Sequence, residues 1–563
     1  MSNPVWPRVA LDAVAERDAR IPEHLRLPPS FLQRYPPGSD VTSAAAESGL
    51  MSDKELELTD HDATSVLAVI KDKKATAMEV ITAFTKRAAI GHQLLCCLSQ
   101  IFFEEGIARA RELDEYYERT GQLVGPLHGL PISVKVHEDA DSQFSIPADF
   151  WQEHMAIKGK NATGGFSGDL GKLISTEHGH LNQILWDAGC VFYCKTNLPQ
   201  SIMHIETFSF WGHTLNPFNT KLTPGGSSGG CGALVAFGGS PMSIGSDIGG
   251  SLRSPAACCG IYTLKSTTRR VPSNLLAGAS AVPGADTVVS TAGPLVRSSR
   301  DIELFFRTVY GAQPWIKDMS LTPLPWGFWT PKWTGTGGKI RLGVLWDDGV
   351  VLPQPPIRRA MRAMVDALKT TNAFEIVDYK PNLHADLIST AYKLYLPDGG
   401  ASVRERAAGE PLCQLTEWCL GLPEVKDHTI HELWALNLER DRIKKLYGDH
   451  WNSQQVDAVL CPAGVGPAQP LQTSKHWGYT IVWNLVDYPA VVFPTGLQAD
   501  PSIDLKDSPR EPWSKYDAHS IACYEPEVFK NAPLSLQIVT RRNTDETTLS
   551  VLKEVEKVLP LRS

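Results

Sequence analysis

The chain has 563 residues, of which 42% are hydrophobic and 21% charged, a composition typical of a globular protein with a large core. Its 54 basic and 62 acidic residues give a net charge of −8 and form no basic stripe, which argues against a nucleic-acid partner. No run reaches the roughly 18 apolar residues of a membrane span, and the N-terminus lacks a secretory signal pattern. We therefore expect a soluble, cytoplasmic protein.

The N-terminal region, 1–58, is predicted to be an arm packed on the body, because prolines and short charged pieces end in the turn-rich YPPGSDVTS. Helices are expected from residue 59 onward, with Thr59 as an N-cap and Gly121 as a stop. Apolar residues recur there at three- and four-residue spacing, as in TAMEVITAFTKRAA. No linker-like segment divides the remainder, so we predict a single domain over 59–563.

Short β-rich runs at 131–136 and 190–197 are predicted to be buried strands, with a helix at 180–189 between them that Gly189 ends. Further on, 340–348 is predicted as a strand before a helix at 357–369, and 456–463 and 489–496 as two more strands. This alternation indicates an α/β fold, with one sheet covered by helices on both faces.

The eleven cysteines include no CxxC pair that answers another, and no ligand-like cluster of residues is visible. Reduced, buried thiols are therefore expected, with neither a metal ion nor another cofactor.

Lys135 lies inside PISVKV, an otherwise apolar strand. Burial disfavours the charged form of a lysine and can produce a neutral amine that acts as a base. The alternative is a lysine at the strand end that reaches solvent.

The segment LTPGGSSGGCGAL, 222–234, places two adjacent serines between glycine pairs. A flexible linker would have this composition, but the core-like run that follows and a second glycine cluster, IGSDIGGSLRSP, argue against one. A serine nucleophile needs a neighbouring base, and no GxSxG elbow anchors a Ser-His-Asp arrangement in this sequence.

These segments resemble the amidase signature family, and GPLHGLPISVK, KTNLPQ and the stretch from TPGGSSGG to GIYTLK carry the likeness. It extends from the arm to NAPLSLQIV near the carboxyl end; the arm is most similar to the fungal acetamidase-type branch, with the fatty acid amide hydrolases next. The resemblance implies a single α/β domain with a large mixed central sheet. It also implies a hydrolase that cleaves a small-molecule carboxamide to a carboxylic acid and an amine or ammonia, through an acyl-enzyme.

Carried over by position, the resemblance implies a triad in which Ser251 is the nucleophile, Ser227 the proton shuttle and Lys135 the base, with a cis peptide bond between Gly226 and Ser227. The family's oxyanion hole corresponds to the backbone N–H groups of Ile248, Gly249, Gly250 and Ser251. Glycines are expected there because a side chain would obstruct the substrate carbonyl. Ser228, Gly226, Asp247 and Arg253 are expected to support the site.

Residues 140–156 read as an insertion relative to the family and carry Phe144, Phe150 and Trp151. We consider two interpretations equally, a lid or wall over the substrate entrance and a surface loop with its aromatic side chains packed on the body.

Other functions remain open at this stage. The same acyl-enzyme would permit ester hydrolysis or acyl transfer. A subunit that works only inside a multi-protein assembly is a third possibility, and a catalytically silent binding protein is a fourth. The sequence leaves the oligomeric state open, with a homodimer as one option.

Overall fold

The computed structural model describes residues 6–136, 155–172, 174–272 and 286–561. The N-terminal part forms α1 (Trp6–Ala19), α2 (Pro29–Leu32), α3 (Ala44–Glu47) and α4 (Asp53–Asp60). We did not predict α1, whose Pro7 lies in the first turn, where a proline is tolerated. The Arg17 side chain donates to the carbonyl oxygens of Leu98 (3.2 Å) and Trp211 (2.8 Å), which ties α1 to the rest of the molecule.

The prediction that Thr59 is an N-cap is wrong, because Thr59 lies inside α4. The side chains that cap the early helices are Ser52 for α4, Asp62 for α5 (Ala63–Lys71) and Thr76 for α6 (Ala77–Leu95). The predicted stop is confirmed: α7 (Phe103–Thr120) ends at Gly121, whose φ of 67° is left-handed.

The described residues form an 11-stranded sheet in the order β1-β3-β2-β6-β8-β7-β12-β13-β11-β9-β10. Its strands are β1 (Leu98–Ile101), β2 (Pro131–Lys135), β3 (Val191–Thr196), β6 (Met242–Asp247), β7 (Tyr262–Lys265), β8 (Thr291–Val296), β9 (Ile340–Val344), β10 (Phe374–Asp378), β11 (Ala458–Pro462), β12 (Ala490–Gln498) and β13 (Pro533–Val539). Strand β2 is parallel to β3 and β6, and β9 is parallel to β10 and β11. The other neighbours are antiparallel. The mixed sheet expected from the resemblance is confirmed.

Helices cover both faces of the sheet. One face packs on α8 (His180–Asp187), α11 (Ser299–Gly311), α12 (Pro355–Lys369) and α19 (Asp545–Val555). The other packs on α9 (Gly229–Ala236), α10 (Arg253–Cys258), α13 (His384–Tyr395), α16 (Ile430–Gln454) and α17 (Gly478–Leu485). Strand β12 shows the alternation, since Val491 and Phe493 join the first core whereas Ala490 and Val492 join the second side.

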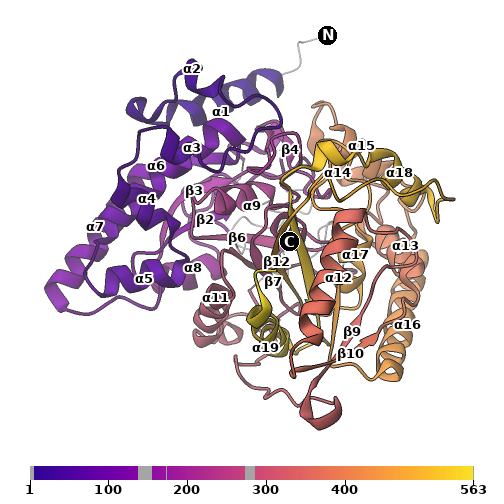
Figure 1. The fold of residues 1–563 in the computed structure, drawn as a ribbon. Helices are drawn as coiled ribbons and strands as arrows, with labels where there is room; N and C mark the ends of the chain where they lie inside the picture. The colour runs from indigo at the N-terminus through magenta and orange to yellow at the C-terminus, as the bar shows by residue number, and fades with distance from the viewer. Residues whose placement is uncertain (1–5, 137–154, 173, 273–285, 562–563) are drawn as a thin grey trace.

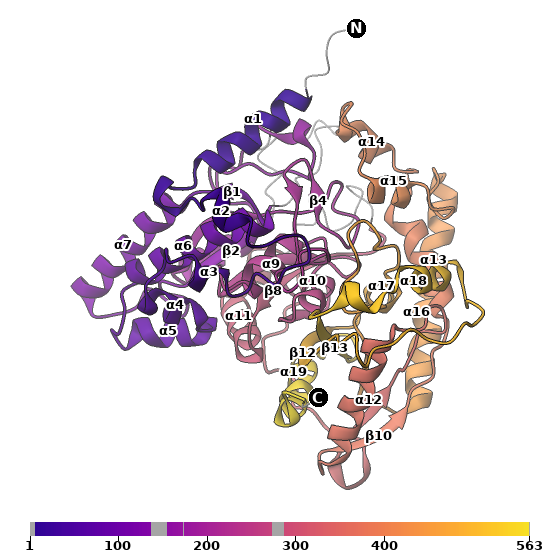
Figure 2. The same cartoon turned by 45° about the horizontal axis from the view of Figure 1, so that its top comes forward.

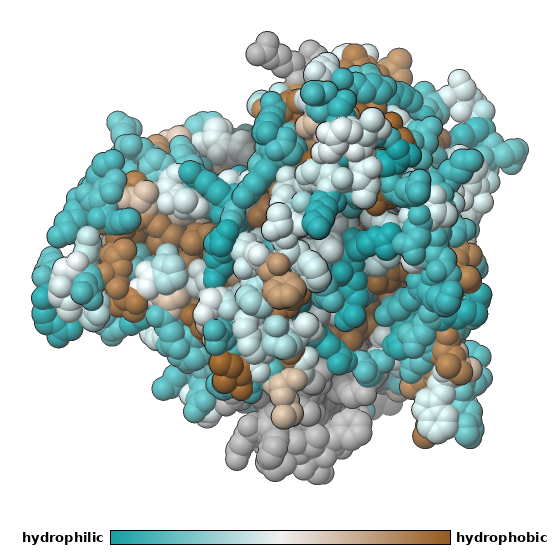
Figure 3. Space-filling model, turned by 90° about the horizontal axis from the view of Figure 1, so that it is seen from below, coloured by the Kyte–Doolittle hydropathy of each residue, from teal (hydrophilic) through white to brown (hydrophobic). Residues whose placement is uncertain are grey.

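The N-terminal helices lie beside one end of the sheet, and α12 and α16 lie beside the other (Figures 1 and 2). Shorter elements of the described chain include β4 (Phe208–Ser209), β5 (Gly212–His213), α14 (Ala401–Ala407), α15 (Gln414–Leu420) and α18 (Lys515–Cys523). On the face seen in Figure 3, hydrophilic residues surround separate hydrophobic patches. A helix long and apolar enough to cross a membrane does not occur in the described ranges.

Candidate active site

The predicted catalytic segments approach each other near the ends of two neighbouring strands. Lys135 ends β2, and Ser251 follows β6, which runs parallel to β2 and beside it. Ser227 lies in the loop that leads into α9. The Lys135 and Ser227 residues are completely buried, and Ser251 is 6% exposed. The alternative in which Lys135 reaches solvent is therefore wrong.

Lys135 contacts two serine hydroxyls. A hydrogen bond of 2.6 Å joins its Nζ to Ser227 Oγ, and a second bond of 3.1 Å joins it to Ser246 Oγ. Ser246 is not among the predicted site residues and lies on β6 beside the lysine strand. An amine between two hydroxyls in a buried site is placed to exchange protons with either one.

The loop around Ser227 is fixed to the loop that carries Ser251. The Gly226–Ser227 peptide bond is cis, as expected. Ser228 donates from its backbone N–H to the carbonyl oxygen of Ser251 (3.2 Å) and from its hydroxyl to that of Ser246 (3.4 Å). A Cβ on Gly226 would lie 2.5 Å from the backbone nitrogen of Glu206, so only glycine fits at this position. These contacts set the spacing between the two serine loops.

The loop that carries Ser251 is folded around the Asp247 carboxylate. The Gly250 N–H donates to Asp247 Oδ1 (2.9 Å), so one of the predicted oxyanion-hole donors is already engaged. The N–H groups of Ile248, Gly249 and Ser251 donate to no other group in the part of the chain that the structure describes. Three N–H groups of the predicted hole are thus left for a ligand.

Asp247 is held by a buried ion pair. Arg253 Nη2 and Nε donate to its two carboxylate oxygens at 2.9 and 3.0 Å, and neither side chain is exposed. Burial by itself would raise the pKa of the Asp247 carboxyl, but Arg253 outweighs it and holds that pKa well below its ordinary value. Asn484 on α17 donates to the same carboxylate (2.9 Å), a contact that could not be predicted from the sequence. Asp247 therefore stays ionised and shapes the loop.

Replacing Arg253 with methionine should lower the free energy of unfolding by about 3 to 5 kcal/mol, because the Asp247 charge would stay buried without its partner. Urea unfolding followed by circular dichroism measures this loss. Arg300→Met is the matched control, since Arg300 is 57% exposed where it pairs with Asp62 and its removal should change the value by less than about 1 kcal/mol. Equal losses in the two variants would contradict the structural role of Arg253.

Lys265, at the end of β7, is also completely buried, and its Nζ has no hydrogen-bond partner in the described ranges. Burial, with a further contribution from Arg253, lowers the pKa of Lys265 from 10.5 to about 8, although Asp487 and Asp247 partly oppose the shift. Between these two values the unfolded chain binds a proton that the folded protein lacks. The stability from this group is therefore complete above pH 10.5 and is lost as the pH falls through about 8.

We expect the free energy of unfolding to rise between pH 8 and 10.5 by on the order of 3 kcal/mol more in the wild-type protein than in Lys265→Met. Taking the difference between the two proteins removes the titration of the other groups. Urea unfolding at several pH values measures this difference. If the free energy of unfolding changed with pH in the same way in both proteins, Lys265 would not contribute to the pH dependence of stability.

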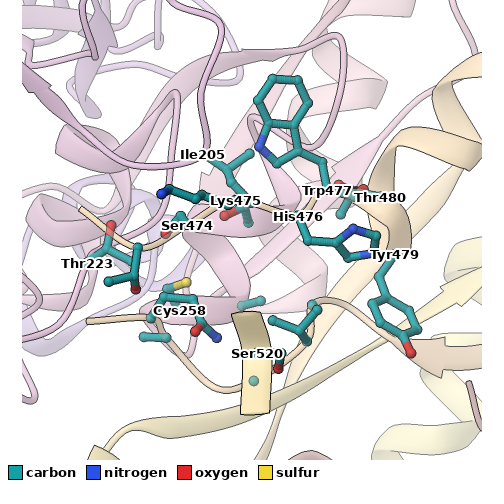
Figure 4. A pocket seen from close by; sticks show the side chains of 18 of the residues that line it. Ile205, Thr223, Cys258, Ser474, Lys475, His476, Trp477, Tyr479, Thr480 and Ser520 are labelled. Atoms are coloured by element: carbon teal, nitrogen blue, oxygen red, sulfur yellow. Dashed lines mark hydrogen bonds between the residues drawn. The ribbon is translucent and has the colours of Figure 1, made fainter. Parts of the chain in front are cut away.

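A hollow lies beside α10, shortly after Ser251 in the chain (Figure 4). Ser254, Cys258 and Thr480 line it, together with Trp477, residues of the loop at 463–469, and Tyr516, His519 and Ser520 of α18. Burial raises the pKa of the Cys258 thiol to about 12, so this cysteine is not a nucleophile at neutral pH.

The predicted insertion at 140–156 falls almost entirely outside the described residues, and so do Phe144, Phe150 and Trp151. Both interpretations of it remain predictions.

Comparison with known proteins places the chain among amidases. The protein family described as "Amidase" matches residues 79–549. A Schizosaccharomyces pombe protein that carries an amidase name is 43% identical over 98% of this chain and 99% of that one. An acetamidase of Emericella nidulans is 34% identical over 98% of each chain. Among solved structures, a fatty acid amide hydrolase has a TM-score of 0.89 at 32% identity and covers 99% of this chain and 95% of its own.

Proposed function

Because the chain belongs to the amidase signature family, and is thereby an amide hydrolase, we propose that Ser251, Ser227 and Lys135 carry out its reaction. The observation that carries the proposal is the 2.6 Å hydrogen bond between the buried Lys135 amine and the Ser227 hydroxyl, in a loop bonded to Ser251. The substrate is a small carboxamide molecule.

In the first step, neutral Lys135 accepts the Ser227 proton while Ser227 accepts the proton of Ser251. The Ser251 oxygen then bonds to the amide carbonyl carbon, whose oxygen becomes an oxyanion. When the C–N bond breaks, Lys135 returns its proton through Ser227 to the leaving nitrogen, and an amine or ammonia departs. Water, activated by the same path, attacks the acyl-enzyme and releases the carboxylic acid.

The oxyanion is stabilised by N–H groups of the loop at 248–251. The Gly250 N–H contributes to the shape of this loop through Asp247, so we assign the direct donors to Ile248, Gly249 and Ser251. Gly249 and Ser251 are buried and Ile248 is partly buried, and a low-dielectric surrounding strengthens the hydrogen bonds that such donors make.

Two measurements test this function. A fluorophosphonate should add once to the wild-type protein, with the adduct mapped to the peptide that contains Ser251 by mass spectrometry. A panel of amides from acetamide to aryl and long-chain amides should show release of amine or ammonia; its two ends follow the names of an acetamidase and a fatty acid amide hydrolase. A folded protein that takes up no label and hydrolyses no amide would refute the proposal.

The proposed compartment is the cytoplasm. All eleven cysteines are free, and most are buried. Free thiols persist in reducing compartments. Fractionation of cells that express the tagged chain would test this, and enrichment with organelles would contradict it.

A further inference from the structure

Two hydroxyl groups from distant parts of the chain bind the carbonyl oxygens of the loop before Ser251. Tyr395, the last residue of α13, donates from its hydroxyl to the Ile248 carbonyl oxygen at 2.5 Å. Thr480 on α17 donates to the Gly249 carbonyl oxygen at 2.6 Å. Both side chains are buried, with 3% of each residue exposed.

These hydroxyls act on the peptide groups that supply the oxyanion-hole donors. The Ile248 carbonyl and the Gly249 N–H belong to one peptide plane, so a hydrogen bond to the carbonyl fixes the direction of that N–H and polarises it. In the next plane the Gly249 carbonyl is bound by Thr480 and the Gly250 N–H by Asp247. Of these two planes, the one held by Tyr395 keeps its N–H, that of Gly249, available to the substrate.

The glycines leave room for these two side chains. A Cβ on Gly249 would lie 2.9 Å from the Tyr395 hydroxyl oxygen, and a Cβ on Gly250 would lie 2.3 Å from Thr480 Oγ1. Gly250 also has a φ of 131°, in the region that favours glycine. Two successive glycines give the loop backbone many accessible conformations. The observed conformation therefore depends on hydrogen bonds from other parts of the chain, such as those from Tyr395 and Thr480.

We propose that Tyr395 is a positioning residue that aims the Gly249 N–H at the oxyanion, with Thr480 fixing the adjoining peptide. This inference rests on the proposed function and on the oxyanion hole assigned there. Tyr395 acts on the reacting atoms indirectly, through its hydrogen bond to the loop. Removing its hydroxyl should therefore weaken binding of the transition state and leave binding of the substrate largely unchanged.

The same helix supplies a matched control. Tyr392 precedes Tyr395 by about one turn, is 1% exposed, and packs on the same tryptophan, Trp477. Its hydroxyl donates to no carbonyl oxygen among the described residues and lies near the backbone of Trp477, outside the Ser251 loop. Tyr392→Phe and Tyr395→Phe therefore remove the same atom from similar surroundings, but only the second change frees a loop carbonyl.

The experiment measures kcat and KM of the full chain and the two variants on an amide that the wild type hydrolyses, together with the Ki of a trifluoromethyl ketone, whose adduct carries an oxyanion. Removing a direct oxyanion donor costs about 10²- to 10³-fold in kcat, so we expect Tyr395→Phe to lose about 10- to 100-fold. Its KM should stay within about twofold, and its Ki should rise by the same factor as kcat falls. Tyr392→Phe should match the wild type in all three.

A second pair keeps the proposal testable if Tyr395→Phe does not fold. Thr480→Val removes the hydroxyl and should lower kcat and raise the ketone Ki, whereas Thr480→Ser retains the hydroxyl and should restore most of both. Folded variants with wild-type kcat, or with a raised KM at unchanged kcat, would overturn the inference alone. A wild-type protein that neither hydrolyses an amide nor reacts with a fluorophosphonate would overturn the proposed function, and this inference with it.

Discussion

Replacing Ser251 with alanine should lower kcat for amide hydrolysis by about 10⁴- to 10⁶-fold, the range expected when a nucleophile is removed from a serine hydrolase. In the proposed mechanism no acyl-enzyme forms without the Ser251 oxygen, and the N–H groups of the loop alone can only bind the substrate. The fluorophosphonate adduct should disappear at the same time. Initial rates at saturating amide, with intact-mass spectrometry for the label, measure both effects.

Ser254→Ala is the control for this experiment. Ser254 is 7% exposed, close to the value for Ser251, and lies in the first turn of the helix that follows. It should keep the label, because its hydroxyl is not joined to the lysine. A label retained by Ser251→Ala, or lost equally from both variants, would assign the nucleophile elsewhere.

Replacing Lys135 with methionine should lower kcat by about 10²- to 10⁴-fold, the contribution typical of general acid–base catalysis. Methionine is of similar length and carries no charge, so the buried position at the end of β2 remains filled. The loss should appear in the rate of fluorophosphonate labelling as well, since that reaction also needs a deprotonated Ser251. Thermal unfolding separates this effect from a failure to fold.

The hydroxyls of Ser227 and Ser246, both hydrogen-bonded to Lys135, should differ in their effect on kcat. Ser227→Ala interrupts the path to Ser251 and should approach the loss seen in Lys135→Met. Ser246→Ala removes only the longer, 3.1 Å contact and should cost no more than about tenfold, the effect of one ordinary hydrogen bond. If Ser246→Ala were the more damaging variant, the proton path would run through β6 instead.

The strands near the site could be predicted because each is a short apolar run between breakers. The observed β2 (Pro131–Lys135) and β3 (Val191–Thr196) fall within the predicted ranges, and α8 (His180–Asp187) lies between them. The order of the sheet could not be predicted, since β7 and β8 exchange places relative to the chain and β12 and β13 come between them and β11. Such pairings depend on contacts between distant residues, which no local pattern encodes.

The residues of the candidate site also fall into a group that could be predicted from the sequence and a group that could not. Lys135, Ser227 and Ser251 could be proposed from the sequence because each lies in a contiguous motif that resembles the amidase signature family. Tyr395 and Thr480 could not, because their own segments are ordinary amphipathic and apolar helices and their partners lie 147 and 231 residues earlier. Their hydroxyls can bind the loop carbonyl groups only after folding brings α13 and α17 to the loop.

The dependence of the Ser251 loop on Asn484, Thr480 and Tyr395 has a consequence during protein synthesis. A ribosome finishes Lys135, Ser227 and Ser251 long before it reaches α17, so a nascent or prematurely terminated chain holds the three proposed catalytic residues without the contacts that shape the Ser251 loop. Such a chain should leave cellular amides untouched. We therefore expect amide hydrolysis only after the segment at 478–485 has packed against the Ser251 loop, so that activity indicates that the chain has finished folding.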